Sequence, residues 1–457
     1  MVKQQKNNMS TKTLIKNCSL VNEGQIRVAD VWIEDGLIQK IGQIADPSDA
    51  ATIIDGTGKF LFPGIIDGQV HFREPGLTHK GDLYTESKAA LAGGVTSFID
   101  MPNTSPNVLS MDILNEKYRI ASEQSLANFG FFLGVNGDNL DEVIKLDTSK
   151  LLGVSDDGLY FTKKGNLLAD NPETMEKLFA NCKAVIAIHS EKEQIVEENE
   201  NQYREKYGEN VPVKFHPLIR SEKACYEATK RAIELANKHQ ARLHILHLTT
   251  EAETHLFRND IPLKEKNITT EVSVHHLWFS DVDYERLGTL IKWNPAIKTE
   301  KDKKGLLKAL LDDRIDLVTT DHAPHTLEEK QKPYFQSMSG APMVQHSLNI
   351  MLEFYKQGLI SLEKIAEKMC HNPAILYHIE KRGFIREGYF ADLTLVDLNT
   401  NWTVSKENIL YKCGWSPVEG TTFHSSITQT FVNGNLVYNN GLFNEKTRGM
   451  ALTTTLG

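Results

Sequence analysis

The chain has 457 residues, of which 40% are hydrophobic and 24% are charged, a composition typical of folded globular proteins. That length is sufficient for one large domain and a smaller one. The net charge of −9 disfavours nucleic-acid binding, because proteins that bind nucleic acids gather Lys and Arg on one face. We therefore expect the ligand to be a small molecule.

The ends of the chain and its cysteines indicate a cellular compartment. The first nineteen residues are polar and basic, and neither they nor any later stretch contains the apolar run of a signal peptide or a membrane span. The five cysteines are scattered and form no Cys-x-x-Cys pair, which suits a reducing compartment. We expect a soluble, cytoplasmic protein without a membrane partner.

Short alternating strands occupy both ends of the sequence. Residues 14–62 read as strands broken by Gly or Asp-Gly turns, and no helical pattern interrupts them. The same pattern returns after residue 380, where Asn433-Gly434 is a hairpin signal. These segments predict one small β-sandwich domain, built from residues 1–64 and 380–457.

Between them, apolar runs alternate with amphipathic segments, which is typical of βα units around a parallel sheet. There are eight such runs over roughly 300 residues, which predicts an α/β fold with a (β/α)₈ TIM-type barrel at residues 65–379. The runs are residues 63–67, 95–101, 128–135, 150–154, 184–190, 242–248, 269–277 and 315–322.

Polar residues gather at the ends of these runs. Barrel enzymes place their chemistry at the carboxyl ends of the strands, and imidazole and carboxylate groups together suit zinc. The pattern therefore predicts a zinc site near the strand ends. The residues at or just past the ends are His71, Asn103, Asp157, His189, His247, His275 and Asp321.

The strongest single motif is Thr-Asp-His-Ala-Pro-His, residues 320–325. An aspartate at the end of a strand, here Asp321, can bind a metal and also accept a proton from water. The alternative, a helix N-cap, does not explain His322 and His325. His189 or His247 alone would more often be a core histidine, but together with Asp321 they favour a metal site.

Three further histidines have weaker signals. His244 lies three residues before His247 and should point to the opposite face of a strand, so we assign it to packing. The roles of His275 and His276 stay open.

The first run leads into Asp67–Gly76, in which Gln69, His71 and Arg73 share one face of an extended chain. Arg73 could bind a substrate carboxylate with two hydrogen bonds, or form a surface ion pair. Asn103 could bind the same carboxylate, or belong to an ordinary turn.

These residues resemble those of dihydroorotases. The match rests on His-Phe-Arg-Glu-Pro-Gly at 71–76, Met-Pro-Asn-Thr at 101–104, His189 and His247, the Asn294-Pro295 pair, and the motif at 320–325, in order over nearly the whole chain. The terminal β segments resemble the composite sandwich of the wider amidohydrolase superfamily. The resemblance implies reversible cyclisation of N-carbamoyl-L-aspartate to L-dihydroorotate in pyrimidine biosynthesis.

The resemblance also implies roles for single residues. Asp321 would be the general acid/base that moves a proton between the metal-bound water and the ring nitrogen. The substrate carboxylate would be held by Arg73, Asn103 and His325. Asn294 would contact the pyrimidine ring, and the floor beneath it would be lined by Ala341 and Pro342.

Two positions depart from the family pattern. The first histidine of the usual His-x-His pair is Gln69, and an amide oxygen is a weaker zinc ligand than imidazole. Many members carry a carboxylated lysine on the fourth strand. The Asp156-Asp157-Gly158 string at this place resembles a subset of dihydroorotases in which the second aspartate replaces that lysine. The alternative is a plain turn. Lys163 and Lys164 read as loop residues. We expect one or two zinc ions, with ligands from His71, Asp157, His189, His247, Asp321 and Gln69. The site of Asp157, His189 and His247 keeps three intact ligands. The other site, which would rest on Gln69, His71 and Asp321, is expected to be weak, differently ligated or empty.

Other functions stay open at this point. A hydantoinase or allantoinase would not need Arg73 and Asn103 to hold a carboxylate. A catalytically silent, dihydroorotase-like partner protein is suggested by Gln69 and by the missing lysine, although it would need none of the polar site residues. A homodimer is expected from the resemblance alone.

Overall fold

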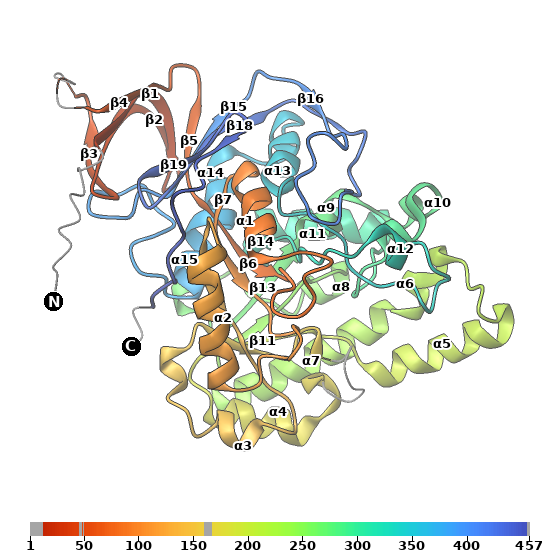
Figure 1. Ribbon diagram of the computed structural model, residues 1–457. Helices are drawn as coiled ribbons and strands as arrows, with labels where there is room; N and C mark the ends of the chain where they lie inside the picture. Colours follow the sequence, from red (N-terminus) through yellow and green to blue (C-terminus); the bar gives the residue numbers. More distant parts are fainter. Residues whose placement is uncertain (1–11, 45–47, 49, 160–166, 455–457) are drawn as a thin grey trace.

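The computed structural model describes residues 12–44, 48, 50–159 and 167–454, and its centre is a closed parallel barrel (Figure 1). The eight predicted runs form its eight strands; the third is divided at Phe132 into β8 and β9. A parallel bridge between Val70 and His322 closes the ring. The strands are β6 (Ile65–Val70), β7 (Val95–Asp100), β8 (Asn128–Phe131) with β9 (Leu133–Gly134), β10 (Gly153–Ser155), β11 (Val185–Ile188), β12 (Leu243–Ile245), β13 (Ile268–Ser273) and β14 (Leu317–Thr319). The predicted barrel is confirmed, and Lys163 and Lys164 lie outside the described residues.

The inside of the barrel is filled by side chains. Ile66, Ile99, Phe132, Leu317 and Tyr377 belong to one buried cluster within it, so the barrel is a packed core and not a pore. Ligands can therefore reach only the ends of the strands.

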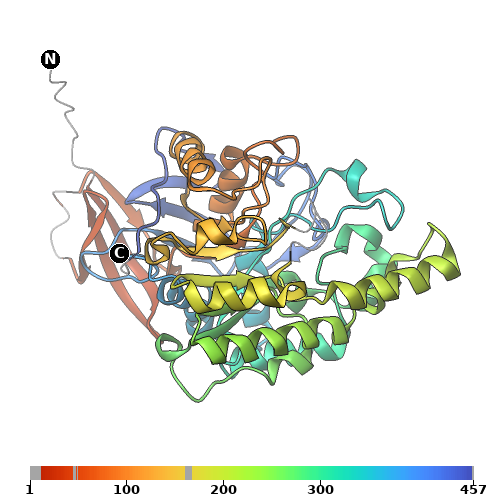
Figure 2. The same cartoon turned by 90° about the horizontal axis from the view of Figure 1, so that it is seen from below.

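Helices surround the barrel, and their first turns are capped by side chains such as Asp82, Ser110, Ser221 and Thr299. None of the described helices is both long and apolar enough to cross a membrane. Helix α5, which is rich in Glu, extends beyond the barrel (Figures 1 and 2). The helices are α1 (Leu83–Ala92), α2 (Met111–Gln124), α3 (Leu140–Val143), α4 (Pro172–Asn181), α5 (Glu193–Tyr207), α6 (His216–Ile219), α7 (Glu222–His239), α8 (Glu251–Thr254), α9 (Val274–Trp278), α10 (Tyr284–Leu287), α11 (Glu300–Leu311), α12 (Leu327–Lys330), α13 (Ser347–Lys356), α14 (Leu362–Ala366) and α15 (Asn372–Leu376).

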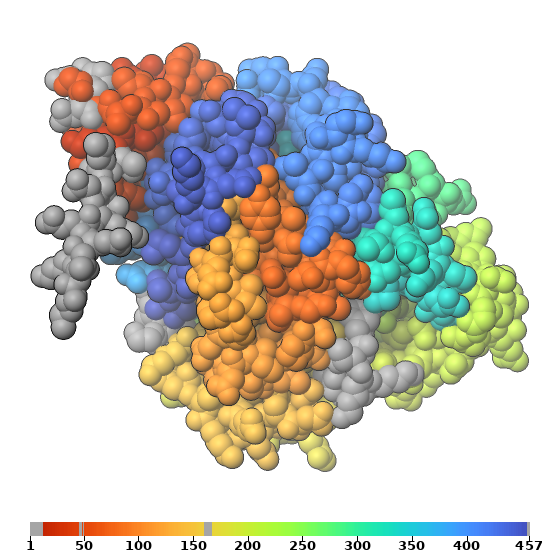
Figure 3. All heavy atoms as spheres, viewed as in Figure 1, coloured from red at the N-terminus to blue at the C-terminus, as the bar shows by residue number. Residues whose placement is uncertain are grey.

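A mixed sheet joins the two ends of the chain, as predicted. Its order is β20-β19-β18-β15-β5-β1-β2-β3, with β4 paired to β1, so that N-terminal β5 lies against C-terminal β15. The two segments adjoin at the surface as red and blue regions (Figure 3). The strands are β1 (Lys12–Asn22), β2 (Gln25–Glu34), β3 (Leu37–Gly42), β4 (Thr52–Asp55), β5 (Phe60–Pro63), β15 (Leu393–Asp397), β18 (Ser426–Val432), β19 (Asn435–Asn439) and β20 (Leu442–Phe443).

The C-terminal segment does not stay in this sheet. Strands β16 (Trp402–Thr403) and β17 (Thr422–Phe423) form a separate pair. Further on, Ala451 bridges to Phe129 of β8, and Leu452 packs in the interior cluster of the barrel. The last described residues therefore return to the barrel, because an apolar side chain there fills the space beside β8.

A buried ion pair connects the sheet to the barrel. Arg382 binds Asp392, and both side chains are almost fully buried. The Asp392 carboxylate also accepts hydrogen bonds from Asn433 N (2.7 Å) and from Asn128 Nδ2 of β8 (3.1 Å). One carboxylate thus holds residues from three segments that are distant in sequence.

Replacing Asp392 by Ala should lower the free energy of unfolding by about 3–5 kcal/mol, because it leaves the Arg382 guanidinium buried without its charge partner. Urea denaturation followed by circular dichroism measures the loss. The control is Asp397→Ala at the partly exposed end of the same strand, which should cost under about 1 kcal/mol. Equal losses in the two variants would contradict this role of the pair.

Candidate metal centre and substrate cavity

Five metal-ligand candidates meet at the carboxyl ends of the barrel strands. They form two sets that share Asp157. Each residue follows a different strand, β6, β10, β11, β12 or β14, and all five side chains are buried. The first set is His71, Asp157 and Asp321, and the second is Asp157, His189 and His247.

The two oxygens of Asp157 face different sets. Oδ2 lies 3.3 Å from His71 Nε2, which is itself 2.9 Å from Asp321 Oδ1. Oδ1 lies 3.7 Å from His189 Nδ1 and 3.9 Å from His247 Nε2, and these two nitrogens are 3.1 Å apart. Ligands about 2.1 Å from a tetrahedral zinc ion lie about 3.4 Å from one another. The donor atoms are therefore of the right kind and spacing for two ions that share one carboxylate.

The charges within the two sets favour a cation. Burial lowers the pKa of His71, but hydrogen bonds with Asp157 and Asp321 outweigh it and raise the pKa to about 10. His247 behaves similarly: burial lowers its pKa, and Asp157 raises it to about 9. Burial raises the pKa of Asp157, but His247 and His71 bring it well below its usual range. Because an imidazole nitrogen must be unprotonated to bind a metal, metal binding at these histidines would release protons.

The backbone is strained at three of the site residues. Arg73, His247 and Asp321 have φ values of 71°, 36° and 45°, a left-handed region that side chains other than glycine rarely adopt. Such a conformation costs on the order of 1–3 kcal/mol and persists where the surrounding structure imposes it. Here it occurs in the residues after β6, β12 and β14, where the chain leaves the barrel.

Neighbouring polar groups orient the histidines. The Nδ1–H of His71 donates to Asn103 Oδ1 over 2.7 Å, which leaves Nε2 for a metal. His189 Nε2 is 2.9 Å from Glu191 Oε2, and Glu191 also pairs with Arg220. This assigns the metal-facing role to Nδ1 of His189.

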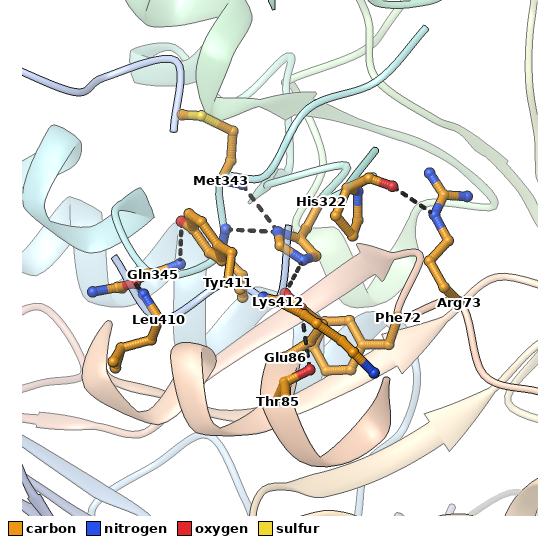
Figure 4. Close-up of polar contacts among 12 residues, drawn as sticks. Phe72, Arg73, Thr85, Glu86, His322, Met343, Gln345, Leu410, Tyr411 and Lys412 are labelled. Carbon is orange, nitrogen blue, oxygen red and sulfur yellow. Dashed lines mark hydrogen bonds and ion pairs between the residues drawn. The ribbon is translucent and has the colours of Figure 1, made fainter. Parts of the chain in front are cut away.

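The strand end that carries Asp321 is held on both sides. Thr320 donates to the buried Asp67 through its hydroxyl (2.6 Å) and its backbone N–H (3.2 Å). His322 Nδ1 accepts from the backbone N–H of Met343 (3.0 Å), and its Nε2–H donates to Glu86 over 2.9 Å (Figure 4). His322 therefore supports the site and does not face the metal ligands.

Gln69 lies beside the shared carboxylate. Its Nε2 donates to Asp157 Oδ2 over 3.0 Å, and its buried Oε1 has no hydrogen-bond partner in the described chain. A half-turn of the amide exchanges the two atoms. Gln69 can thus support Asp157 or offer an oxygen to the first set, and its role as a metal ligand stays a prediction.

A narrow cavity of about 20 Å³ opens onto the first set. Arg73 lies in its wall, where Nε donates to Pro324 O (3.1 Å) and Nη2 donates to His325 Nε2 (3.1 Å). Lys80 lies near the other ring nitrogen of His325, at 3.1 Å, and pairs with Glu329. The cavity is lined by His71, Arg73, Asn103, Asp157, Gly158, Trp293, Asn294, Asp321, Ala323, Ser339 and Gly340.

The substrate-binding residues predicted from the sequence divide into two groups. Arg73, Asn103 and Asn294 line this cavity, and His325 lies behind Arg73 in the wall of an adjoining one. Ala341 instead bridges to His322, and neither it nor Pro342 lines the cavity. The residues of that turn that do so are Ser339 and Gly340.

Gly158 fits closely against Asn103. Its φ is +71°, and a Cβ atom there would lie 2.0 Å from Asn103 Nδ2. The Asp-Asp-Gly string is therefore a turn that also brings Asp157 among the candidate ligands, while Gly158 leaves room for Asn103.

The three histidines with weaker signals in the sequence, His244, His275 and His276, are all buried. His244, assigned to packing, forms an ion pair with Glu271 (3.0 Å), so its role is polar as well as steric. His275 stacks on the cavity residue Trp293, with ring centroids 4.0 Å apart, and also lies against His276.

Several supporting groups have no signal in the sequence. Glu191, Glu86 and Lys80 read as ordinary charged residues of helical or loop segments, yet each is buried beside a site histidine. Only Glu191 could have been suspected, since it lies two residues after His189.

Comparison with known proteins agrees with this geometry. Residues 60–437 match the model of the amidohydrolase family. A dihydroorotase of Methanosarcina acetivorans is 33% identical, over 89% of this chain and 88% of its own length, and one of Pyrococcus furiosus is 30% identical, over 92% and 91%. The solved structure of the L-hydantoinase from Arthrobacter aurescens superposes with a TM-score of 0.88 at 26% identity, over 97% of this chain and all of its own. The chain belongs to the amidohydrolase family.

Proposed function

We propose that this protein is a dihydroorotase, which interconverts N-carbamoyl-L-aspartate and L-dihydroorotate. The observation that carries the proposal is the arrangement of one cavity: the first set of metal ligands lies at one side, and Arg73, backed by His325 and Lys80, lies at another. A buried guanidinium beside a hydrolytic centre favours a cyclic amide that bears a carboxylate. The dihydroorotases among the relatives at 30–33% identity support the same choice.

The residues divide the work of such a reaction. Zinc bound by the two sets would polarise the amide carbonyl and lower the pKa of a water molecule. The Asp321 carboxylate accepts the proton that the attacking water loses and returns it to the ring nitrogen. Burial raises the pKa of Asp321, and the hydrogen bond with His71 opposes this. Arg73 and Asn103 bind the substrate carboxylate, and Asn294 contacts the ring.

A hydantoinase is the second candidate, favoured by the similarity to the L-hydantoinase structure. Hydantoins lack the carboxylate that Arg73 would bind, so substrate preference separates the two activities. A silent partner protein is less well supported, because it would not need two complete ligand sets.

The zinc-loaded protein should hydrolyse L-dihydroorotate with a kcat/KM at least about 100-fold above that for dihydrouracil, which lacks the carboxylate. Replacing Arg73 by Met should remove most of this preference, because it deletes the charged partner of the substrate. Absorbance near 230 nm follows both reactions, with and without a chelator. As a control, Arg27→Met on the exposed part of β2 should leave the preference unchanged. Equal turnover of both substrates by the wild type would favour the hydantoinase.

Changing Asp321 to Asn should lower kcat by about 10²- to 10⁴-fold, because the amide cannot accept the proton. Metal content is measured on the same sample, since Asp321 also belongs to the first set, whereas the second set stays complete. Asp147→Asn, at an exposed carboxylate, serves as the control. Wild-type turnover in Asp321→Asn would exclude this residue as the general base.

A further inference from the structure

Two loops that are distant from Arg73 in the sequence form another part of the cavity wall. One contributes Trp293 and Asn294, and the other contributes Ser339 and Gly340. Neither loop belongs to a strand or helix, so interactions outside regular secondary structure must fix their separation. A single backbone hydrogen bond joins them directly, from Gly340 N to Lys292 O over 2.9 Å.

The side chain of Lys330 joins the same loops. Its Nζ donates to Lys292 O (3.1 Å), Met338 O (2.8 Å) and Gly340 O (2.7 Å), and the side chain is fully buried at the end of α12. An ammonium group has three N–H donors, and here three carbonyl oxygens accept them. Two of the accepting residues flank Ser339, and the third immediately precedes Trp293.

Lys292 adds a second connection of the same kind. Its Nζ donates to Tyr334 O (2.6 Å) and Ser337 O (2.7 Å) of the other loop. The Ser337 hydroxyl in turn donates to Lys330 O over 2.8 Å. Two buried lysines therefore connect the loops through backbone carbonyls, and neither forms an ion pair within the described residues.

A buried ammonium is an expensive way to join two loops, because taking the charge out of water costs several kcal/mol unless dipoles replace the hydration. An apolar side chain in the same place would remove this donor from all three carbonyl oxygens, although Lys292 O would keep its hydrogen bond from Gly340 N. The lysine satisfies all three, although burial and the nearby Lys292 and Arg73 lower the pKa of its amine well below the usual range.

We propose that Lys330 is a positioning residue for substrate binding: its ammonium group sets the distance between the loops of Asn294 and Ser339 and so fixes the part of the cavity that receives the ring. The choice of substrate in this inference rests on the proposed function, whereas the hydrogen bonds of Lys330 do not depend on it. In this role the loops hold the ligand equally well in the ground state and in the transition state. A change in their separation therefore affects KM and leaves kcat nearly unchanged.

The test is Lys330→Met, which keeps a long unbranched side chain and removes the donors and the charge. In the zinc-loaded, full-length protein, the KM for L-dihydroorotate should rise about tenfold or more, while kcat changes less than about threefold and metal content is unchanged. The matched control is Lys332→Met, two residues further on at an exposed position of the same loop, which should leave KM unchanged.

Hydrogen exchange gives a second readout that does not depend on turnover. In Lys330→Met, exchange should become faster at residues 292–294 and 337–340, while the barrel strands keep wild-type rates. Should Lys330→Met not fold, Lys330→Gln is examined in the same way. An unchanged KM with unchanged exchange would overturn the proposal, as would faster exchange spread evenly over the barrel. If the wild type does not act on dihydroorotate, the proposed function fails, and local exchange alone decides the role of Lys330.

Discussion

The carboxylate of Asp157 faces two groups of ligands at once. One oxygen is directed to His71 and the other to the His189–His247 pair, so neither set is complete without it. Two divalent cations placed a few ångströms apart repel each other strongly, and an anionic ligand between them offsets that repulsion. In family members with a carboxylated lysine, the lysine carries a carboxylate to this position; a short aspartate can take its place only if the backbone brings it close. The turn at Asp156-Asp157-Gly158 does so, since Asp156 binds the backbone N–H of His189 and Gly158 packs against Asn103.

The rest of the site holds the other ligands against this fixed point. The left-handed backbone of His247 and Asp321 directs their side chains inward, and the hydrogen bonds of Thr320 to Asp67 maintain the position of the second. Asn103 and Glu191 select the metal-facing nitrogens of His71 and His189. Asp67, Thr320 and Glu191 are buried and Asn103 is half-buried, so the cost of leaving their partners unpaired is high and the ligands have little freedom to move.

The sequence predicted the barrel and the ligands for the same reason. Continuous apolar runs mark the strands, and a polar residue directly after such a run must lie at the carboxyl end of the barrel. His189, His247 and Asp321 could be recognised in this way without any knowledge of the surrounding structure. The supporting residues could not. Glu86 lies 236 positions from His322, and Lys330 meets the carbonyl of Lys292 from another segment, so their roles depend on contacts that only the fold creates. Ser339 and Gly340 line the cavity beside the predicted Ala341 and Pro342, which the motif alone did not indicate. The return of residues 449–452 to the barrel was not predicted either, because the four residues Gly-Met-Ala-Leu are too short to give a strand signal.

Metal stoichiometry in Asp157→Asn tests the shared carboxylate most directly. Purified wild-type and variant proteins are loaded with zinc, freed of excess metal and analysed by inductively coupled plasma mass spectrometry, with circular dichroism to verify the fold. If Asp157 completes both sets, a folded variant loses metal from both and retains well under half of the wild-type content. A folded variant that binds as much zinc as the wild type would contradict the account, since the two sets would then be held without the residue that joins them.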